Sequence, residues 1–356
     1  MLLMLRLLVL GIGLGVITGT GLKLLAPHLA QPSGGGSGPS GPGGALANEA
    51  LNAMAGKQTL PKGRPLGQFE MRRELTELSQ RWAQLAAAQK GLQASGFLLV
   101  LDDGRFAQLQ PDQPLPAASS IKSPILLAAM EDFDAGKLDW NAPLTLSQEV
   151  IGGGAGWMGA RPKGTRFPLH LAATEMIRVS DNTATNLLIK CLGGKVALNA
   201  RFAQLGLTNT VLRNWLPDLN GTNTTSSRDL ARTIALVETG EMLSPRARDL
   251  FRETLSHSHT NTLIPLGLLK GLGKDSADPD SELLAEGITV LNKTGDIGIS
   301  YADAALIELP DGTRAVAAFM VKGPFNDPRS TDLIRAMAGA AAKVLIPAAR
   351  RPGGSN

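Results

Sequence analysis

The chain has 356 residues, of which 43% are hydrophobic and 19% are charged, a composition that is typical of a globular protein and excludes a disordered one. Length alone suggests about two domains. The 35 Lys and Arg residues, against 31 Asp and Glu, are scattered instead of forming a basic stripe, which argues against nucleic acid as a partner. Cys191 is the only cysteine, so no internal disulfide can form, and its apolar neighbours predict a buried side chain more than a nucleophile.

The N-terminal region differs in composition from the rest of the chain. Residues 7–22 form an apolar, Gly-interrupted run between Arg6 and Lys23, which indicates an export signal or, as we favour, an uncleaved membrane anchor. Gly, Ser and Pro dominate the stretch that follows and predict a flexible linker. We therefore expect a signal or membrane anchor at residues 1–30 and a linker at 31–66. A catalytic domain is expected at 67–349 and a disordered tail at 350–356. Export would place the domain at the periplasmic face of the inner membrane.

The patterns in the folded region place strands at both of its ends and helices between them. Leu78 and Trp82 recur at helical spacing within residues 69–93, which predicts an amphipathic helix before the first strand. Strands, the first two joined by an Asp-Gly turn, are predicted at 96–102, 105–109, 288–293, 302–309 and 313–321. Helices are predicted within 120–269 and at 331–345. This order predicts an α+β fold, with an antiparallel sheet built from both chain ends, flanking helices and an inserted all-helical lobe. The site is expected in the cleft between the lobes.

Several patterns imitate binding motifs without the context that those motifs need. The alternating glycines in residues 11–15 lie inside the apolar N-terminal run, with no strand before them. Gly273-Lys274 lacks the earlier glycine of a phosphate-binding loop. His257 and His259 have no neighbouring side chains that complete a set of metal ligands. We therefore predict neither a metal nor a cofactor.

The strongest chemical signal is a Ser-x-x-Lys motif at residues 119–122, just before an apolar helical pattern. At the mouth of a helix, Ser119 and Lys122 lie one turn apart on one face, so the amine can reach the hydroxyl and take its proton. That reaction requires a neutral lysine. The helix N-terminus and a second cation nearby would both lower the pKa of Lys122 and favour the neutral form.

Two further motifs follow in the chain. Ser180-Asp181-Asn182 opens a helical run, and Lys293-Thr294-Gly295 ends a strand, where Gly295 removes a side chain that would block a substrate backbone. Each motif alone also fits a structural interpretation, as a helix cap or a strand end. The three in this order, each in a suitable local context, indicate an acyl-transfer site.

The three motifs resemble those of class A β-lactamases and penicillin-binding proteins, and the resemblance covers about residues 96–345. It implies three catalytic residues, namely the nucleophile Ser119, the base Lys122 and the proton relay Ser180. It implies that Asn182 contacts the substrate amide and that Lys293 and Thr294 bind the substrate carboxylate. Gly295 is expected to leave room for the substrate backbone. The backbone N–H groups expected to form the oxyanion hole are those of Ser119 and Asp296.

One position departs from the β-lactamase pattern. In class A β-lactamases a glutamate four residues before the asparagine of this loop activates the water that cleaves the acyl-enzyme. Here Leu216 stands four residues before Asn220, and an apolar side chain cannot deprotonate water. Asp218 is the remaining candidate base. The loop, with its leucine, resembles the penicillin-binding protein A group of cyanobacteria, which are D-Ala-D-Ala peptidases.

This resemblance implies a membrane-associated serine DD-peptidase, carboxypeptidase or transpeptidase, that acts on peptidoglycan stem peptides through an acyl-Ser119 intermediate and binds β-lactams covalently. Two alternatives stay open: a class A-type β-lactamase that uses Asp218 or another base, and a non-hydrolytic β-lactam-binding sensor. The expected partners are a stem peptide or a β-lactam, and a membrane through the N-terminal segment.

Overall fold

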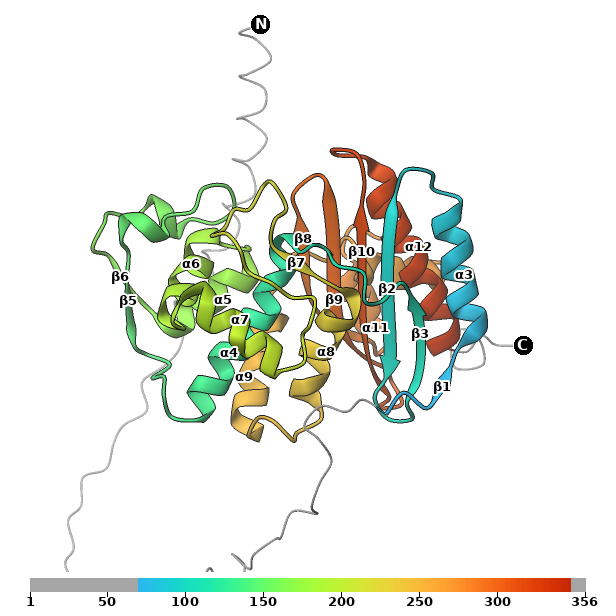
Figure 1. The fold of residues 1–356 in the computed structure, drawn as a ribbon. Helices are drawn as coiled ribbons and strands as arrows, with labels where there is room; N and C mark the ends of the chain where they lie inside the picture. Colours follow the sequence, from blue (N-terminus) through green and yellow to red (C-terminus); the bar gives the residue numbers. More distant parts are fainter. Residues whose placement is uncertain (1–69, 347–356) are drawn as a thin grey trace, which may run out of the picture. The chain divides into compact units, whose positions relative to one another are not determined.

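The computed structural model describes residues 70–346; the predicted anchor, the predicted linker and the C-terminal tail lie outside them. Within this range no helix is long and apolar enough to cross a membrane. The core element is a six-stranded sheet in the order β1-β3-β2-β10-β9-β8 (Figure 1). All neighbouring strands are antiparallel except β1 and β3. The strands are β1 (Arg73–Glu74), β2 (Gln93–Val100), β3 (Arg105–Leu109), β8 (Thr289–Asp296), β9 (Ser300–Glu308) and β10 (Arg314–Lys322).

The sheet separates two hydrophobic cores. In β2, Phe97 and Leu99 face one core whereas Leu98 and Val100 face the other, because successive side chains of a strand point to opposite faces. Burial on both faces explains why the central strands read as nearly continuous apolar runs. The predicted strands are all present; β3 has the predicted ends, and the ends of the other four shift by one to three residues.

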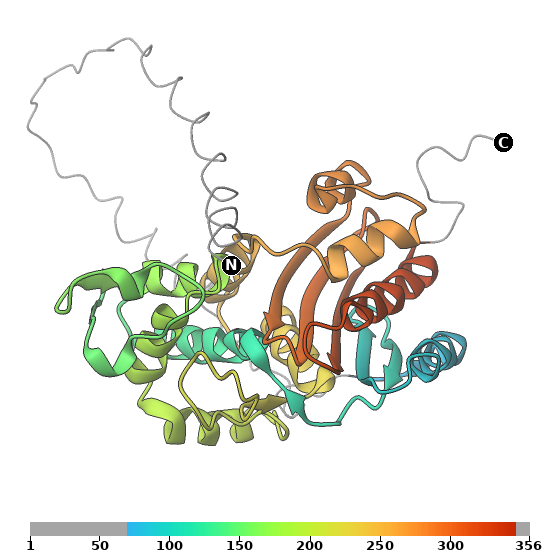
Figure 2. The ribbon, with the colours of Figure 1, turned by 90° about the horizontal axis from the view of Figure 1, so that it is seen from above.

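One face of the sheet is covered by α3 (Thr76–Ala87), α10 (Ile264–Gly271) and α12 (Pro328–Leu345), with α11 (Pro279–Ala285) beside α10 (Figure 2). Trp82 of α3 is fully buried, as its spacing predicts, and its Nε1 donates to the Met337 carbonyl at 2.9 Å. The predicted helix over 69–93 is too long, because a turn through Gly91, with φ of +85°, leads the chain into β2.

The other face packs against a lobe inserted between β3 and β8. It contains α4 (Lys122–Asp134), α5 (Leu169–Arg178), α6 (Asn182–Cys191), α7 (Gly194–Gln204), α8 (Ser227–Glu238) and α9 (Pro245–Ser256). The predicted helical lobe also carries two short ribbons, β4 (Leu115–Pro116) with β7 (Thr224–Thr225) and β5 (Pro143–Thr145) with β6 (Arg166–Pro168). Strands of two or three residues are too short to show a period in the sequence.

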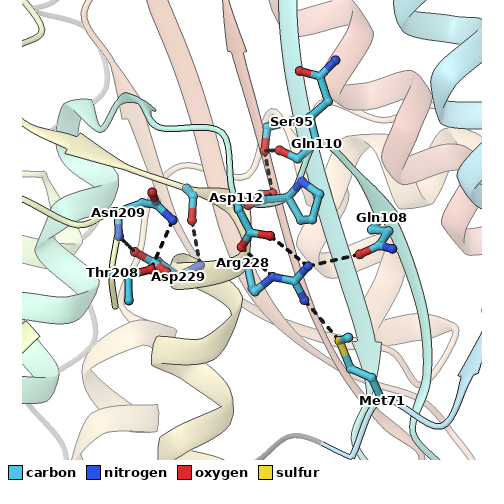
Figure 3. Close-up of polar contacts among 12 residues, drawn as sticks. Met71, Ser95, Gln108, Gln110, Asp112, Thr208, Asn209, Arg228 and Asp229 are labelled. Carbon is cyan, nitrogen blue, oxygen red and sulfur yellow. Dashed lines mark hydrogen bonds and ion pairs between the residues drawn. The ribbon is translucent and has the colours of Figure 1, made fainter. Parts of the chain in front are cut away.

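Polar contacts join the first turn of α8 to the sheet (Figure 3). The Arg228 guanidinium donates to both carboxylate oxygens of Asp112, at 2.7 and 3.2 Å, and lies 4.7 Å from the ring centroid of Phe97 on β2. Next to it, the hydroxyls of Ser227 and Ser95 lie 2.7 Å apart. These contacts fix the helical lobe against the sheet, and the three sequence motifs come together where the lobe meets the sheet.

Candidate active site

Ser119 lies where a short 3-10 helix, η1 (Ala118–Ile121), runs directly into α4. The first nine residues of α4 are buried, which matches a helix that is apolar all round and fixes the serine at the rim of a rigid core. The preceding residue, Ala118, has φ of +47°. For a residue with a side chain this left-handed conformation costs about 1–3 kcal/mol, a strain that clusters at functional sites.

The structure brings Ser119, Lys122 and Ser180 together. Lys122 Nζ lies 3.0 Å from Ser119 Oγ and 2.9 Å from Ser180 Oγ. The same nitrogen lies 2.7 Å from the Ser180 carbonyl and 3.0 Å from Asn182 Oδ1. The Lys122 side chain is completely buried, so these four oxygens form its polar surroundings.

The chemistry of these oxygens favours a lysine that acts as a base. A carbonyl and an amide oxygen can only accept hydrogen bonds, so the Ser180 carbonyl and Asn182 Oδ1 occupy both N–H groups of a neutral Lys122 amine. The lone pair is then left for a hydroxyl proton, and the Ser119 hydroxyl is within reach. Lys122 is thus arranged to take the proton of Ser119.

Electrostatics favour the same protonation state. Burial lowers the pKa of Lys122 well below its ordinary value, and the positive charge of Lys293 lowers it further, while Asp181 opposes both. Lys293 of the third motif is therefore the second cation expected near Lys122. A neutral lysine beside a serine hydroxyl is a base ready to act near neutral pH.

The second motif owes its geometry to its middle residue. Asp181 caps α6, because its Oδ1 accepts from the Ala184 N–H at 2.8 Å, and its Oδ2 accepts from the N–H groups of Trp157 and Met158 at 2.7 and 2.9 Å. Ser180 precedes this anchored cap and has φ of +58°. That backbone places both its hydroxyl and its carbonyl on Lys122.

Asn182 also faces Lys122. Its Oδ1 accepts from Lys122, and its Nδ2 donates to the Gly153 carbonyl at 2.8 Å. An amide has two N–H groups, and the Gly153 carbonyl takes one of them, so the predicted contact with the substrate amide would use the other. The loop that carries Gly153 passes close over the motif: a Cβ on Gly156 would lie 2.1 Å from the Asp181 carboxyl carbon.

Lys293 and Thr294 lie on β8, the sheet strand that faces the helical lobe (Figure 1). Lys293 is 1% exposed, and its Nζ donates to the Thr294 carbonyl at 2.9 Å. Burial lowers the pKa of Lys293 to about 8, and Asp303 on β9 opposes this change. Below that pH the site holds a poorly solvated cation, which suits a carboxylate.

The packing of Gly295 gives a second reason for a glycine here, beside the expected space for a substrate backbone. A Cβ at this position would lie 2.7 Å from the Ser120 nitrogen and 2.9 Å from the Ser119 nitrogen, so the glycine allows β8 to pack directly on η1. The Ile297 N–H donates to the Ser300 carbonyl on β9 at 3.2 Å. Because strand residues alternate in direction, the Asp296 N–H points away from β9, to the free edge of β8. The two predicted oxyanion-hole amides therefore belong to backbone segments in contact.

Leu216 is 4% exposed and belongs to the core of the helical lobe. Asn186 fixes its backbone: Oδ1 accepts from the Leu216 N–H at 2.9 Å, and Nδ2 donates to the Leu216 carbonyl at 2.7 Å. The alternative base, Asp218, accepts from the Thr222 hydroxyl at 2.9 Å and from the Asn223 N–H at 2.6 Å. Its two carboxylate oxygens both bond within their own loop, an arrangement that braces the loop and does not point to a water-activating role.

The remaining reactive side chains lie apart from this arrangement. Cys191 ends α6, about 14 Å along the helix from Asn182, and burial and Asp132 raise the pKa of its thiol. His257 Nδ1 lies 2.7 Å from the Glu253 carbonyl. Among residues 70–346 no group of three His, Cys, Asp or Glu side chains is arranged to hold a metal ion.

Two residues at the site were missed by the sequence motifs. The Thr260 hydroxyl lies 2.6 Å from the Thr294 hydroxyl, and the fully buried Asp303 is next to Lys293. Thr260 lies in a polar stretch without a pattern. Asp303 did leave a signal, because it is the one charged residue in the apolar run from 302 to 307, and a buried charge needs partners.

Comparison with known protein families matches residues 77–345 to a family described as the β-lactamase enzyme family. The chain belongs to this β-lactamase family. Among its curated relatives, a β-lactamase from Streptomyces albus G is 28% identical over 169 residues, 44% of this chain and 54% of the relative. The extended-spectrum β-lactamase PER-1 of Pseudomonas aeruginosa is 25% identical over 65% of this chain and 76% of its own length. The chain spans about half the length of the first of these relatives.

Solved structures similar to this chain include PBP-A, which is 41% identical, with a TM-score of 0.71 over 77% of this chain and 97% of PBP-A. A mutant of PBP-A with the same similarity is described as an acyl-enzyme complex with penicillin G. An ancestral class A β-lactamase, 24% identical with a TM-score of 0.64 over 75% of this chain and 99% of its own, shares the fold. The chain is therefore a member of the β-lactamase-like, penicillin-binding serine hydrolase superfamily, with the predicted α+β fold.

Proposed function

We propose that this protein is a serine DD-peptidase, a carboxypeptidase or transpeptidase, which acts on peptidoglycan stem peptides and is acylated by β-lactams. The observation that carries the proposal is Leu216. Where class A β-lactamases hold the carboxylate that releases the acyl group, this chain holds a buried apolar side chain. The likeness to PBP-A, and the penicillin acyl-enzyme described for its mutant, support acylation by β-lactams.

The site geometry supports the following acylation step. Ser119 Oγ attacks the carbonyl carbon of the terminal D-Ala-D-Ala amide, and its proton moves to Lys122 Nζ. The N–H groups of Ser119 and Asp296 stabilise the negative oxygen, an interaction worth about 3 kcal/mol for each donor. As the C–N bond breaks, the proton passes through Ser180, whose hydroxyl contacts the same lysine, to the leaving nitrogen. Free D-Ala and an acyl-Ser119 ester result.

The terminal carboxylate of a stem peptide and the ring carboxylate of a penicillin have the same chemistry, and the Lys293 ammonium and the Thr294 hydroxyl suit both. Water or an amine then cleaves the ester. With Leu216 in place of a positioned base, we expect slow hydrolysis of a penicilloyl ester, since a general base contributes about 10²- to 10⁴-fold. Export to the periplasmic face of the inner membrane is part of this proposal, because peptidoglycan is assembled outside the cytoplasm.

A class A-type β-lactamase is the second candidate, and the names of the curated relatives favour it. Three measurements on the full chain separate the candidates. Intact-mass analysis after mixing with penicillin G should show one long-lived adduct, mapped to Ser119 and absent in Ser119→Ala. A stem peptide should release D-Ala, and nitrocefin should turn over slowly in the steady state. Nitrocefin turnover at many cycles per second would favour the β-lactamase, and an adduct on Ser120 or Ser180 would remove the proposed nucleophile.

A further inference from the structure

Polar side chains of the segment between α9 and α10 form a hydrogen-bonded row that ends on Thr294 of the Lys-Thr-Gly motif. The Thr294 hydroxyl donates to Thr260 Oγ1 at 2.6 Å, and Ser258 Oγ lies 3.2 Å from the same atom. Thr260 belongs to the segment 257–263 that connects α9 to α10. The expected carboxylate ligand Thr294 therefore has a hydroxyl partner that no motif includes.

Buried groups hold the Thr260 segment from below. Asn292 Nδ2 donates to the Thr260 carbonyl at 2.8 Å and to Asp303 Oδ1 at 2.9 Å. The other carboxylate oxygen of Asp303 accepts from the Ile264 N–H, at the start of α10, at 2.9 Å. Asn292 is 4% exposed and Asp303 is fully buried. A buried polar network with its partners in place fixes one arrangement, so the position of Thr260 is set by β8, β9 and α10 together.

The bonding capacity of a hydroxyl gives Thr260 a specific role. Each hydroxyl has a single proton and two acceptor sites. In the structure, the proton of Thr294 is directed at Thr260. When a carboxylate binds, Thr260 can donate to Thr294 Oγ1, so that the one proton of Thr294 turns to the carboxylate. A polarised chain of this kind strengthens the outer hydrogen bond.

The same network acts on Lys293. Burial raises the pKa of Asp303 to about 7, while hydrogen bonds from Ile264 and Asn292 and the charge of Lys293 lower it. In its charged form Asp303 raises the pKa of Lys293 against the effect of burial. The other titratable group that faces Lys293 is Lys122 on α4, and its positive form would repel the Lys293 ammonium. Asp303 thus supports a charge that the carboxylate site requires.

We infer that Thr260, Asn292 and Asp303 are positioning residues that align the Thr294 hydroxyl and support the Lys293 ammonium for the free carboxylate of the substrate. The inference rests on the proposed function, since it concerns acylation by a substrate with a free carboxylate. Because these residues act through Thr294 and Lys293, their loss affects substrates with a carboxylate and spares those without one.

The test compares acylation of the full chain by penicillin G and by its methyl ester, which lacks the free carboxylate. In Thr260→Val, the second-order rate constant of acylation should fall about 10- to 100-fold for the acid and less than about threefold for the ester. Thr260→Ser restores the hydroxyl and should stay within about threefold of wild type. Thr262→Val, at an exposed position of the same segment, should change neither rate. If Thr260→Val loses its fold by circular dichroism, Thr260→Ala carries the same expectation.

Asp303→Asn provides a second readout. Removing the charge that raises the pKa of Lys293 should move the alkaline limb of acylation by penicillin G to lower pH, whereas a purely structural role would leave this limb in place. Equal losses for acid and ester in folded Thr260 variants, or no loss for the acid, would overturn the inference while leaving the proposed function intact. Absence of any adduct on the wild type would overturn the proposed function and the inference with it.

Discussion

Lys122 and Lys293 are neighbouring buried lysines whose proposed roles need opposite protonation states. Burial and the charge of Lys293 lower the pKa of Lys122 well below its usual range, which provides a base. Burial lowers the pKa of Lys293 only to about 8, because Asp303 opposes it. The difference arises from their partners: carbonyl and hydroxyl oxygens surround Lys122, and a carboxylate supports Lys293.

The lowered pKa of Lys293 predicts the pH dependence of acylation. Lys293 carries its proton below about pH 8, so the rate with penicillin G should fall as the pH rises through that value. The methyl ester should lack this alkaline limb, because it has no carboxylate to anchor. Stopped-flow acylation from pH 6 to 10 measures both. Lys293→Ala should remove the limb, while Lys122→Ala should abolish acylation of either compound. A shared alkaline limb for acid and ester would contradict the anchoring role.

Leu216→Glu tests the missing base. The variant should hydrolyse its penicilloyl ester faster, recovering part of the roughly 10²- to 10⁴-fold that a general base supplies, with a rate of formation within about tenfold of wild type. Asn186 bonds to the Leu216 backbone, so the loop should keep its position. The lifetime of the adduct by stopped flow and mass analysis measures the effect.

The matched control is Leu219→Glu, which adds the same carboxylate to the same loop at a side chain that is 68% exposed. It should leave the adduct lifetime unchanged. Replacing the buried Leu216 can cost about 2–5 kcal/mol, so the folding of both variants is compared first. Rapid clearance of penicillin by the wild type would mean that Leu216 is not a deficit, and the β-lactamase assignment would replace the peptidase one.

At the scale of elements, the sequence predicted the strands and helices that have periodic apolar runs, and the contacts that lie within one local motif. The strands β8, β9 and β10 and the helices α4 and α12 follow from apolar runs and their turns. Ser119 and Lys122 lie within reach of each other as predicted because they are one helical turn apart, whereas the place of Ser180 beside them was implied by the family resemblance and not by spacing. The Thr260–Thr294 contact joins residues 34 apart in the chain, through a loop with no pattern. Tertiary packing alone determines such a contact.

The proposed acylation should depend on the contact between two elements, β8 and η1. In Gly295→Ala the new Cβ would meet the backbone nitrogens of Ser119 and Ser120, and backbone atoms cannot turn aside as a flexible side chain can. A displaced η1 should lower the acylation rate by about 10²-fold or more, with a stability loss of about 1–3 kcal/mol. Gly153→Ala is the control, because a Cβ added at Gly153 would meet no atom within 4 Å. Near-normal acylation in Gly295→Ala would show that this contact does not position the nucleophile.

At the scale of the whole molecule, the site lies between two bodies that must stay docked. Lys122 and Ser180 belong to the helical lobe, and Lys293 to Asp296 belong to the sheet. The Arg228 contacts in Figure 3 are one of the places where these bodies are joined. Asp112 is 60% exposed on its side chain, so solvent weakens its ion pair, and the guanidinium above the Phe97 ring carries more of the energy.

Arg228→Ala should therefore lower the free energy of unfolding by about 1–2 kcal/mol, through loss of the cation–π contact and the hydrogen bonds to Asp112 and Gln108. Urea denaturation followed by circular dichroism measures this change. Arg248→Ala, whose ion pair is with its exposed chain neighbour Asp249, should stay within about 0.5 kcal/mol of wild type. An equal loss of stability in both variants would indicate a general effect of removing positive charge. No loss of stability in Arg228→Ala would show that the Arg228 contacts do not hold the lobe against the sheet.

Because Gly295 packs on η1, the proposed labelling of Ser119 by a β-lactam should be sensitive to the docking of the two bodies. The serine, its base and the carboxylate ligands come from distant parts of the chain, and their proposed geometry exists only while β8 rests on the turn that carries Ser119. A fluorescent penicillin should thus mark only molecules in which the lobes are assembled. In a denaturant series, the fraction of the protein labelled in a short pulse would report the fraction of molecules with docked lobes. Circular dichroism instead averages over all helices, including those of partly opened chains.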